Sequence, residues 1–170
     1  MSARKRKLSG FTLVEILIVV VILGILAAIV IPQFTSASET AKASSLVTQL
    51  QSIRSQLELY QIQHNGDYPT AAQMAQFLNL TIATDVLGAA GIDYGPYLMK
   101  APANPFSAGV LGIEVAAGSG ALGVATAAVG WVYNDVNGEV QGSMEVTKAI
   151  DSGLLDPGQT GADSLDIQTY

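Results

Sequence analysis

The chain begins with a long apolar run that differs from everything after it. Residues 16–31 carry no polar side chain, and thirteen of these sixteen residues are Leu, Ile or Val. Counted from residue 11, the run has twenty-one positions, which is enough for a helix to span the hydrocarbon core of a bilayer. The pattern therefore predicts a membrane helix close to the N-terminus.

Glu15 is the one charged residue inside this run. A central acidic residue costs about 2.5–3.5 kcal/mol on insertion, whereas the thirteen Leu, Ile and Val residues favour insertion by about 4–8 kcal/mol. Basic residues at 4–7 are expected to stay on the cytoplasmic side. The alternative is an ordinary secretory leader ending near residues 36–38, but the apolar core of such a leader is shorter and carries no carboxylate.

After Pro32 the pattern becomes amphipathic. Apolar residues and the only histidine recur at spacings of three and four, at Leu46, Leu50, Ile53, Leu57, Tyr60 and His64. This spacing predicts a helix with one buried face, and Asn65-Gly66 predicts its end. We expect the face to pack on a sheet, because a coiled coil would need more heptads.

The remaining residues predict one small α+β domain. Thr70 and Gln73 have the spacing of a capping box, which would open a short helix through about Leu78. Short β-branched runs interrupted by glycine predict weak strands in 107–128. Asn137-Gly138 predicts a hairpin turn, with Trp131 and Tyr133 on one core-facing side together with Val129.

Composition excludes several kinds of chemistry. The chain has no cysteine, so it has no disulfide, no thiol catalysis and no cysteine-ligated zinc. It also lacks a phosphate-binding loop, a nucleophile elbow and an HExxH motif, so we expect neither an enzyme nor a catalytic residue. His64, near a helix end, is interpreted as a dipole or capping residue.

The charge of the chain is strongly acidic. Eight basic and fourteen acidic residues give a net charge of −6, and without residues 1–10, which hold four of the basic ones, the balance is 4 minus 14, or −10. Nucleic-acid binding is therefore not expected. Residues 143–170 are rich in Gly, Ser and Asp and predict a solvated acidic tail. Its oxygen ligands also suit calcium, although no EF-hand spacing is present.

The stretch SGFTLVEILIVVVILGILAAIVIP at residues 9–32 resembles the class III leader and first helix of type IV pilins and type II secretion pseudopilins. The resemblance implies that a prepilin peptidase cuts between Gly10 and Phe11 and that Phe11 becomes N-methylated. It also implies that Glu15 is the assembly glutamate and that Gly24 and Pro32 weaken the helix.

The physical role of Glu15 follows from the same cleavage. The freed amine of Phe11 in one subunit and the Glu15 carboxylate of another can pair inside a helix bundle only if the subunits are offset along its axis. Such a buried pair adds specificity of register more than net stability.

Three further stretches resemble the major pseudopilin of type II secretion systems: NGDYPT at 65–70, GPYL at 95–98, and 102–106, where Asn104 replaces the usual aspartate. The resemblance implies a pilin-like α+β fold, with a long N-terminal helix packed on a small antiparallel sheet. Major pseudopilins bind calcium through a glycine-rich C-terminal loop, but the loop of this chain does not align with theirs, so we expect an acidic surface tail with no metal and no cofactor, and bound calcium is the alternative. The expected segments are a leader at 1–10, a transmembrane and polymerisation helix at 11–32, its amphipathic continuation at 33–65, a globular domain at 66–142 and a tail at 143–170.

The function implied by the resemblance is that of a structural subunit. It would polymerise with itself and other pilin-like subunits, driven by an assembly ATPase and an inner-membrane platform protein, to export folded proteins. The subunit would cross the bacterial inner membrane once, with its N-terminus cytoplasmic and its domain periplasmic, and the filament would lie in the periplasm or at the cell surface. Alternatives are a type IV pilus subunit for adhesion, motility or DNA uptake, and a membrane-anchored binding protein that does not polymerise.

Overall fold

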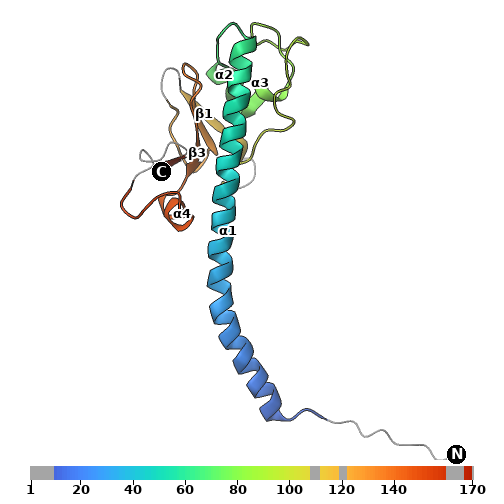
Figure 1. Cartoon of the computed structure of the whole chain (residues 1–170), viewed down its shortest axis with the longest axis vertical. Coiled ribbons are helices and arrows are strands. Elements are labelled where there is room, and N and C mark those ends of the chain that lie inside the picture. The colour runs from blue at the N-terminus through green and yellow to red at the C-terminus, as the bar shows by residue number, and fades with distance from the viewer. Residues whose placement is uncertain (1–9, 108–111, 119–121, 160–166, 170) are drawn as a thin grey trace, which may run out of the picture. The chain divides into compact units, whose positions relative to one another are not determined.

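The computed structural model describes residues 10–107, 112–118, 122–159 and 167–169. The chain divides into two compact units, residues 1–37 and residues 38–170. Both contain part of one long helix, α1, which spans Leu13–Gln63 (Figure 1). The predicted helix over residues 11–64 is therefore confirmed to within two residues at each end.

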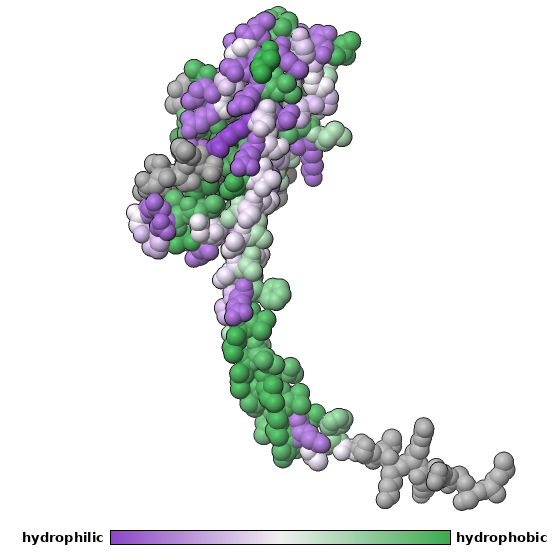
Figure 2. Space-filling model, in the orientation of Figure 1, coloured by the Kyte–Doolittle hydropathy of each residue, from purple (hydrophilic) through white to green (hydrophobic). Residues whose placement is uncertain are grey.

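The first unit consists, in its described part, of the apolar portion of α1. Figure 2 shows hydrophobic side chains over this portion of the helix. The helix continues through Gly24 and Pro32, so the weakening predicted at these two positions stays a prediction. The hydroxyl groups of Thr35 and Ser36 bond back to the helix itself, donating to the Ile31 and Pro32 carbonyls at 3.2 Å each. By length and composition, α1 alone among the described helices can cross a membrane.

In the second unit, α1 supplies one face of the hydrophobic core. The predicted face is confirmed, since no member is more than 2% exposed: Leu46, Leu50, Ile53, Leu57, Tyr60 and His64. Full burial of each large apolar side chain stabilises the fold by about 1.5–3 kcal/mol. Leu46 lies so close to Gly142 that a Cβ at this glycine would collide with the leucine side chain, so the helix and the sheet approach closely here.

The chain leaves α1 at the predicted stop. Asn65 and Gly66 have φ of 58° and 95°, and the Gly66 N–H donates to the Gln61 carbonyl at 2.9 Å. The capping box at Thr70 and Gln73 is confirmed and opens α2, Ala71–Met74. The predicted continuous helix through Leu78 is wrong, because a 3₁₀ turn, η1 (Ala75–Phe77), and a separate helix, α3 (Leu78–Thr81), follow instead.

The cause of this break is a pair of left-handed residues. Gln76 and Phe77 have φ of 51° and 58°. Left-handed backbone costs about 1–2 kcal/mol per residue. The turn buries the Phe77 ring completely, edge-on to Trp131 with ring centroids 6.0 Å apart. Burial of one phenylalanine contributes about 1.5–3 kcal/mol, which offsets much of the strain.

Within the described part of the chain, four strands form one sheet in the order β1-β2-β3-β4. Their bounds are Val115–Gly118, Trp131–Asn134, Val140–Met144 and Ile167–Thr169. The hairpin between β2 and β3 is antiparallel, as predicted, and Trp131 and Tyr133 are fully buried. The α+β class is therefore confirmed, whereas the expected antiparallel sheet is wrong, because β1 pairs with β2 and β3 with β4 in parallel.

Long connections make these parallel pairings possible. Residues 119–130 link β1 to β2, and residues 145–166 link β3 to β4. Parallel neighbours need a crossover of a dozen or more residues, and both connections are that long. The second includes α4, Val146–Asp151.

The predicted solvated tail at 143–170 is wrong for the residues described. Its first two residues belong to β3, and α4 and β4 follow. Ala149 and Ile167 are 0% exposed, Met144 is 1% exposed and Leu155 is 4% exposed, so four described side chains of this segment belong to the core. Because the segment is rich in Gly, Ser and Asp, its few apolar residues gave no clear sequence pattern. Two of its aspartates, Asp163 and Asp166, lie outside the described residues.

Candidate functional site

Glu15 and Thr12 form a closed hydrogen-bonded pair at the start of α1. The Thr12 N–H and the Thr12 hydroxyl both donate to Glu15 Oε2 at 2.8 Å. The Glu15 N–H donates back to Thr12 Oγ1 at 3.2 Å. This arrangement is a capping box, in which the two side chains satisfy backbone groups that the first helical turn leaves open.

The Thr12–Glu15 pair accommodates a carboxylate at the start of an apolar helix. Negative charge is favourable at a helix N-terminus, where the dipole is positive. Thr12 supplies two donors to the same oxygen, and no described residue donates a hydrogen bond to Glu15 Oε1. A second cationic or N–H donor can therefore approach Glu15 without breaking the capping box.

The structure places the predicted processing residues beside this pair. Gly10 and Phe11 precede α1, and a Cβ at Gly10 would have no atom within 4 Å. Phe11 is 83% exposed, so no described residue covers the peptide bond between Gly10 and Phe11. Gly24 and Pro32 lie further along α1 and do not join this group.

Sequence reasoning did not single out Thr12. The signal was present, because a threonine three residues before a glutamate at the start of an apolar run is the spacing of a capping box. The motif that identified Glu15 drew attention to its neighbours in other subunits instead. The structure adds a partner within the same chain.

The surface around this site is apolar throughout. Every large hydrophobic side chain from Phe11 to Phe34 is at least 45% exposed. A continuous apolar surface of this length needs a membrane or a protein partner. The start of α1 is therefore the part of the described chain that most clearly requires an environment other than water.

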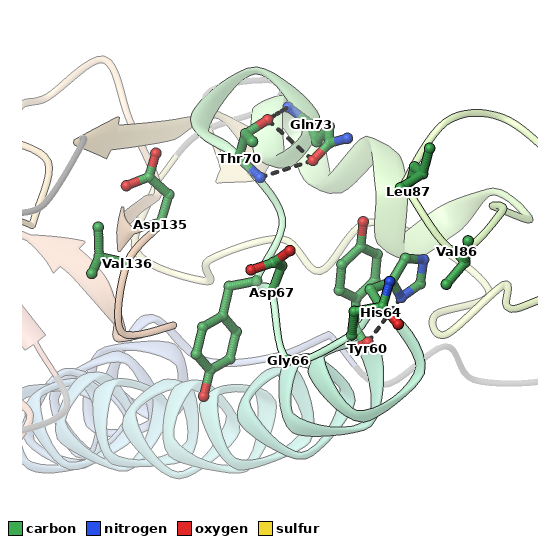
Figure 3. A pocket seen from close by; sticks show the side chains of 12 residues that line it. Tyr60, His64, Gly66, Asp67, Thr70, Gln73, Val86, Leu87, Asp135 and Val136 are labelled. Atoms are coloured by element: carbon green, nitrogen blue, oxygen red, sulfur yellow. Dashed lines mark hydrogen bonds between the residues drawn. The ribbon is translucent and has the colours of Figure 1, made fainter.

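A pocket of about 470 Å³ lies at the C-terminal end of α1. Figure 3 shows the Asp67 and Asp135 carboxylates on two of its sides and Tyr60 and His64 on another. His64, predicted to be a capping or dipole residue, is 2% exposed, and its ring nitrogens bond the Tyr60 carbonyl at 2.8 Å and Thr84 Oγ1 at 3.0 Å. Both ring nitrogens of His64 therefore take part in hydrogen bonds within the domain.

The described residues offer no basis for a metal site. No three His, Asp or Glu side chains among them come together. Of the loop in which calcium was considered, Asp156 is described and its N–H bonds Gln159 Oε1 at 2.7 Å. The remaining carboxylates of that loop, Asp163 and Asp166, lie outside the described residues.

Comparison with known families gives two adjoining matches. A model described as the prokaryotic N-terminal methylation motif matches residues 5–31, and one described as type II secretion system (T2SS) protein G matches residues 33–111. Type II secretion system core protein G of Klebsiella pneumoniae is 34% identical over 97 residues, which cover 57% of this chain and 68% of the relative. The chain belongs to the type II secretion system protein G family.

Other members of the protein G family match stretches of 70–100 residues. The Escherichia coli K12 protein is 33% identical over 100 residues, covering 59% of this chain and 68% of the relative. The Pseudomonas aeruginosa protein is 44% identical over 70 residues, which are 41% of this chain and 49% of the relative. The chain thus spans about half the length of several curated relatives that it matches. No solved structure matches it.

Membership of the protein G family confirms the resemblance found in the sequence, including the pilin-like α+β fold. The methylation motif covers Gly10, Phe11 and Glu15. The family is structural rather than enzymatic, and its apolar helix fits a single-pass membrane anchor. The protein G match ends at residue 111, so all four strands lie beyond it.

Proposed function

We propose that this protein is the structural subunit of a pseudopilus, a pilus-like filament that polymerises through α1 and drives export of folded proteins in type II secretion. The observation that carries the proposal is the exposed apolar surface of α1 between Leu13 and Phe34, in which Glu15 is the one charged residue. Before assembly, the subunit crosses the inner membrane once, with its N-terminus cytoplasmic and residues 38–170 periplasmic.

Processing prepares the helix for assembly. A prepilin peptidase hydrolyses the peptide bond between Gly10 and Phe11, so water adds across the amide and leaves the Gly10 carboxylate and the Phe11 amine. The neutral amine can attack a methyl donor and take its methyl group, and the methylated amine then takes up a proton at neutral pH. Cleavage thus creates a cation next to the helix start that the unprocessed chain does not have.

Glu15 and the new amine together set the register. In a single subunit, Thr12 holds Oε2 of Glu15. In the polymer, the Phe11 ammonium of a neighbouring copy approaches Glu15 and pairs with it in an environment without water. Breaking one member of such a buried pair costs about 3–5 kcal/mol, so copies at the wrong offset are rejected.

The energetics also explain why assembly needs a machine. Lipid tails are as apolar as the side chains of α1, so moving the helix from bilayer to filament core gains little hydrophobic free energy. Packing and the Phe11–Glu15 pair supply specificity. The free energy for extracting the helix from the bilayer must come from another protein. We assign that work to a cytoplasmic assembly ATPase acting through an inner-membrane platform protein.

The test compares two substitutions that remove the same charge. Glu15→Ala should abolish filaments and secretion in cells while leaving the subunit in the membrane. Glu145→Ala, an exposed position before α4 with a 3.7 Å ion pair to Lys148, serves as the matched control and should assemble normally. Intact filaments of Glu15→Ala would refute polymerisation through this residue.

The mass of the natural protein tests processing independently. A terminus at Phe11 with one added methyl, lost in cells without prepilin peptidase, is expected. Retention of Met1 would make the chain an uncleaved anchor. Long surface filaments with unimpaired secretion would instead assign the subunit to a type IV pilus.

A further inference from the structure

The pocket at the C-terminal end of α1 carries two carboxylates. Asp67 follows the helix and Asp135 directly follows β2, and Figure 3 shows the two acidic groups on different sides of the pocket. The Asp67 N–H donates to the His64 carbonyl at 3.0 Å, but no described residue donates a hydrogen bond to the Asp67 carboxylate. The pocket therefore contains an acceptor that the described part of the chain leaves unpaired.

Aromatic and aliphatic side chains surround these carboxylates. The rings of Tyr60 and His64 form one wall of the pocket, and both residues are buried. Val86, Leu87 and Val136 also line the pocket, but all three are exposed to solvent. Aliphatic surface beside a carboxylate is complementary to a lysine or arginine side chain, which has an apolar stem and a cationic end.

The two carboxylates make the electrostatic potential in the pocket negative. Burial raises the pKa of Tyr60, and the Asp85 and Asp67 carboxylates add to this rise. Burial is also the largest cause of the raised pKa of Tyr133, and the Asp135 carboxylate is the next. Both aspartates of the pocket thus act on buried neighbours, and the same field attracts a cation that enters the pocket.

The described residues of the chain do not supply this cation. Lys42 and Lys148 pair with glutamates three positions away, at 2.9 and 3.7 Å, and Arg54 donates to the Val140 carbonyl at 3.0 Å. Lys100 is exposed, and none of these four basic residues lines the pocket. A metal ion fits the pocket less well, because no three His, Asp or Glu side chains among the described residues come together.

We propose that this pocket binds a lysine or arginine side chain of a protein other than this chain, with the cation between Asp67 and Asp135 and the aliphatic stem against Leu87 and Val136. A copy of this chain fits less well. Without residues 1–10 each copy has a net charge of 4 minus 14, or −10, so copies repel one another, and a copy can offer only Lys100 without breaking a contact of its own. The inference rests on the proposed function only for its setting, in which a filament subunit meets proteins bound for export.

The first experiment measures peptide binding to the full chain in detergent. The probe is a dye-labelled peptide, Leu-Arg-Leu with blocked ends, and its control carries citrulline, which has the shape of arginine without the charge. Fluorescence anisotropy should give a Kd about tenfold lower for the arginine peptide at low salt, and this advantage should shrink as added salt screens the charges.

Aspartate variants locate the binding. Asp67→Asn should remove most of the advantage of the arginine peptide and leave the fold intact, because Asp67 is exposed and no described residue donates a hydrogen bond to its carboxylate. Asp135→Asn should act in the same direction. Asp156→Asn is the matched control, since it removes the same charge from an exposed position outside the pocket, and it should bind both peptides as the natural chain does. The unfolding midpoint, followed by Trp131 fluorescence, verifies that each variant is folded.

A second experiment separates this contact from filament assembly. In cells, Asp67→Asn should leave the filament yield per membrane-inserted subunit unchanged but reduce the secretion of exported proteins severalfold. Failure of the proposed function would appear as a natural chain that forms no filaments. The peptide titration needs no filament, so it tests the pocket independently of that function.

Five results would overturn the proposal. Equal affinity for the arginine and citrulline peptides would show that charge does not matter, and equal losses for Asp67→Asn and Asp156→Asn would show a diffuse effect of net charge. Tighter peptide binding by Lys100→Gln would show that a second copy fills the pocket through Lys100. A reduced filament yield for Asp67→Asn would also make the pocket a contact between copies, and normal secretion by this variant would contradict a partner met during export.

Discussion

The ring of His64 lies flat on the ring of Tyr60, with centroids 3.6 Å apart and planes inclined by only 3°. His64 Nδ1 donates to the Tyr60 carbonyl, since a carbonyl can only accept, and Nε2 pairs with Thr84 Oγ1 at 3.0 Å. The Thr84 N–H also bonds the Tyr94 carbonyl at 2.9 Å. The only histidine of the chain therefore joins the end of α1 to the loop around Thr84.

His64→Leu should weaken the fold without affecting processing. The leucine keeps the bulk but loses both hydrogen bonds, so we expect a loss of about 2 kcal/mol in the free energy of unfolding. Urea unfolding followed by Trp131 fluorescence measures it. Ser52→Ala, at an exposed position of the same helix, is the control and should change stability by less than about 0.5 kcal/mol. An unchanged midpoint for His64→Leu would show that the stack is not structural.

In the second unit, truncating a side chain should destabilise the fold on the buried side of α1 and have little effect on the exposed side. Leu50 is 0% exposed and Ile62 is 77% exposed. Leu50→Ala should cost about 2–5 kcal/mol, because it removes buried methyl groups and leaves a cavity. Ile62→Ala should be nearly neutral in the single subunit. Equal losses in urea unfolding would contradict the assigned burial.

Tyr133 should make the domain sensitive to alkali. Burial, together with the nearby Asp135 carboxylate, raises the pKa of Tyr133 well above its usual value. The folded chain therefore keeps this proton while the unfolded chain loses it near pH 10. This contribution is fully present below about pH 10 and is lost as the pH rises towards the folded pKa.

Tyr133→Phe isolates this effect. At neutral pH the variant loses the hydrogen bond from the phenol to the Pro69 carbonyl, 2.9 Å long, and should be about 1 kcal/mol less stable. Above pH 10 the natural chain should lose stability faster than the variant, so their unfolding curves converge. Burial also raises the pKa values of Tyr60 and Tyr97. Both tyrosines remain in both chains, so their effect on the pH dependence is the same in the natural chain and the variant. Parallel curves at all pH values would refute the assignment.

Two glycines with positive φ provide a matched pair for the hairpin turn. Gly138 has φ of 71° and Gly153 has φ of 75°. A Cβ at Gly138 would collide with the Tyr68 ring, whereas a Cβ at Gly153 would meet nothing within 4 Å. Alanine strains the backbone at both sites by about 1–2 kcal/mol. Gly138→Ala should therefore lower the Tm clearly more than Gly153→Ala, and equal effects would show that Tyr68 moves aside freely.

Local patterns in the sequence predicted the helical parts of this fold well. The buried face from Leu46 to Tyr60 depends only on a 3.6-residue period, and the cap at Thr70 depends only on a three-residue spacing. Gly10, Phe11 and Glu15 were singled out for the same reason, because a contiguous motif carries them, and their roles stay predictions. Thr12 was missed although its spacing to Glu15 was equally local.

Features that depend on distant partners were not predictable in this way. Ile167 is buried because β4 pairs with β3 across a connection of twenty-two residues, 145–166, and no local signal marks that pairing. The left-handed turn at Gln76 and Phe77 contains neither glycine nor proline, and burial of the Phe77 ring favours it. The buried Asn104 likewise finds its acceptors, the carbonyls of Gly130 and Ser143, only when these distant segments fold together.

The Thr12–Glu15 pair yields a graded prediction for assembly. Thr12→Val keeps the shape of the side chain but removes the hydroxyl that donates to Glu15 and accepts its N–H. Loss of an N-cap costs about 0.5–2 kcal/mol, and Glu15 then lacks one of its two donors. Filament yield should fall severalfold, less than in Glu15→Ala, whereas Thr12→Ser should assemble normally.

The measurement is the filament yield per membrane-inserted subunit for Thr12→Ser, Thr12→Val and Glu15→Ala, because this ratio separates assembly from insertion. Thr12→Ser restores the hydroxyl with a smaller side chain, so it distinguishes loss of the cap from loss of packing. If valine and serine behave alike, the hydroxyl plays no part. If valine is as damaging as Glu15→Ala, the Thr12 hydroxyl is as necessary for assembly as the Glu15 carboxylate, and the graded order expected here is wrong.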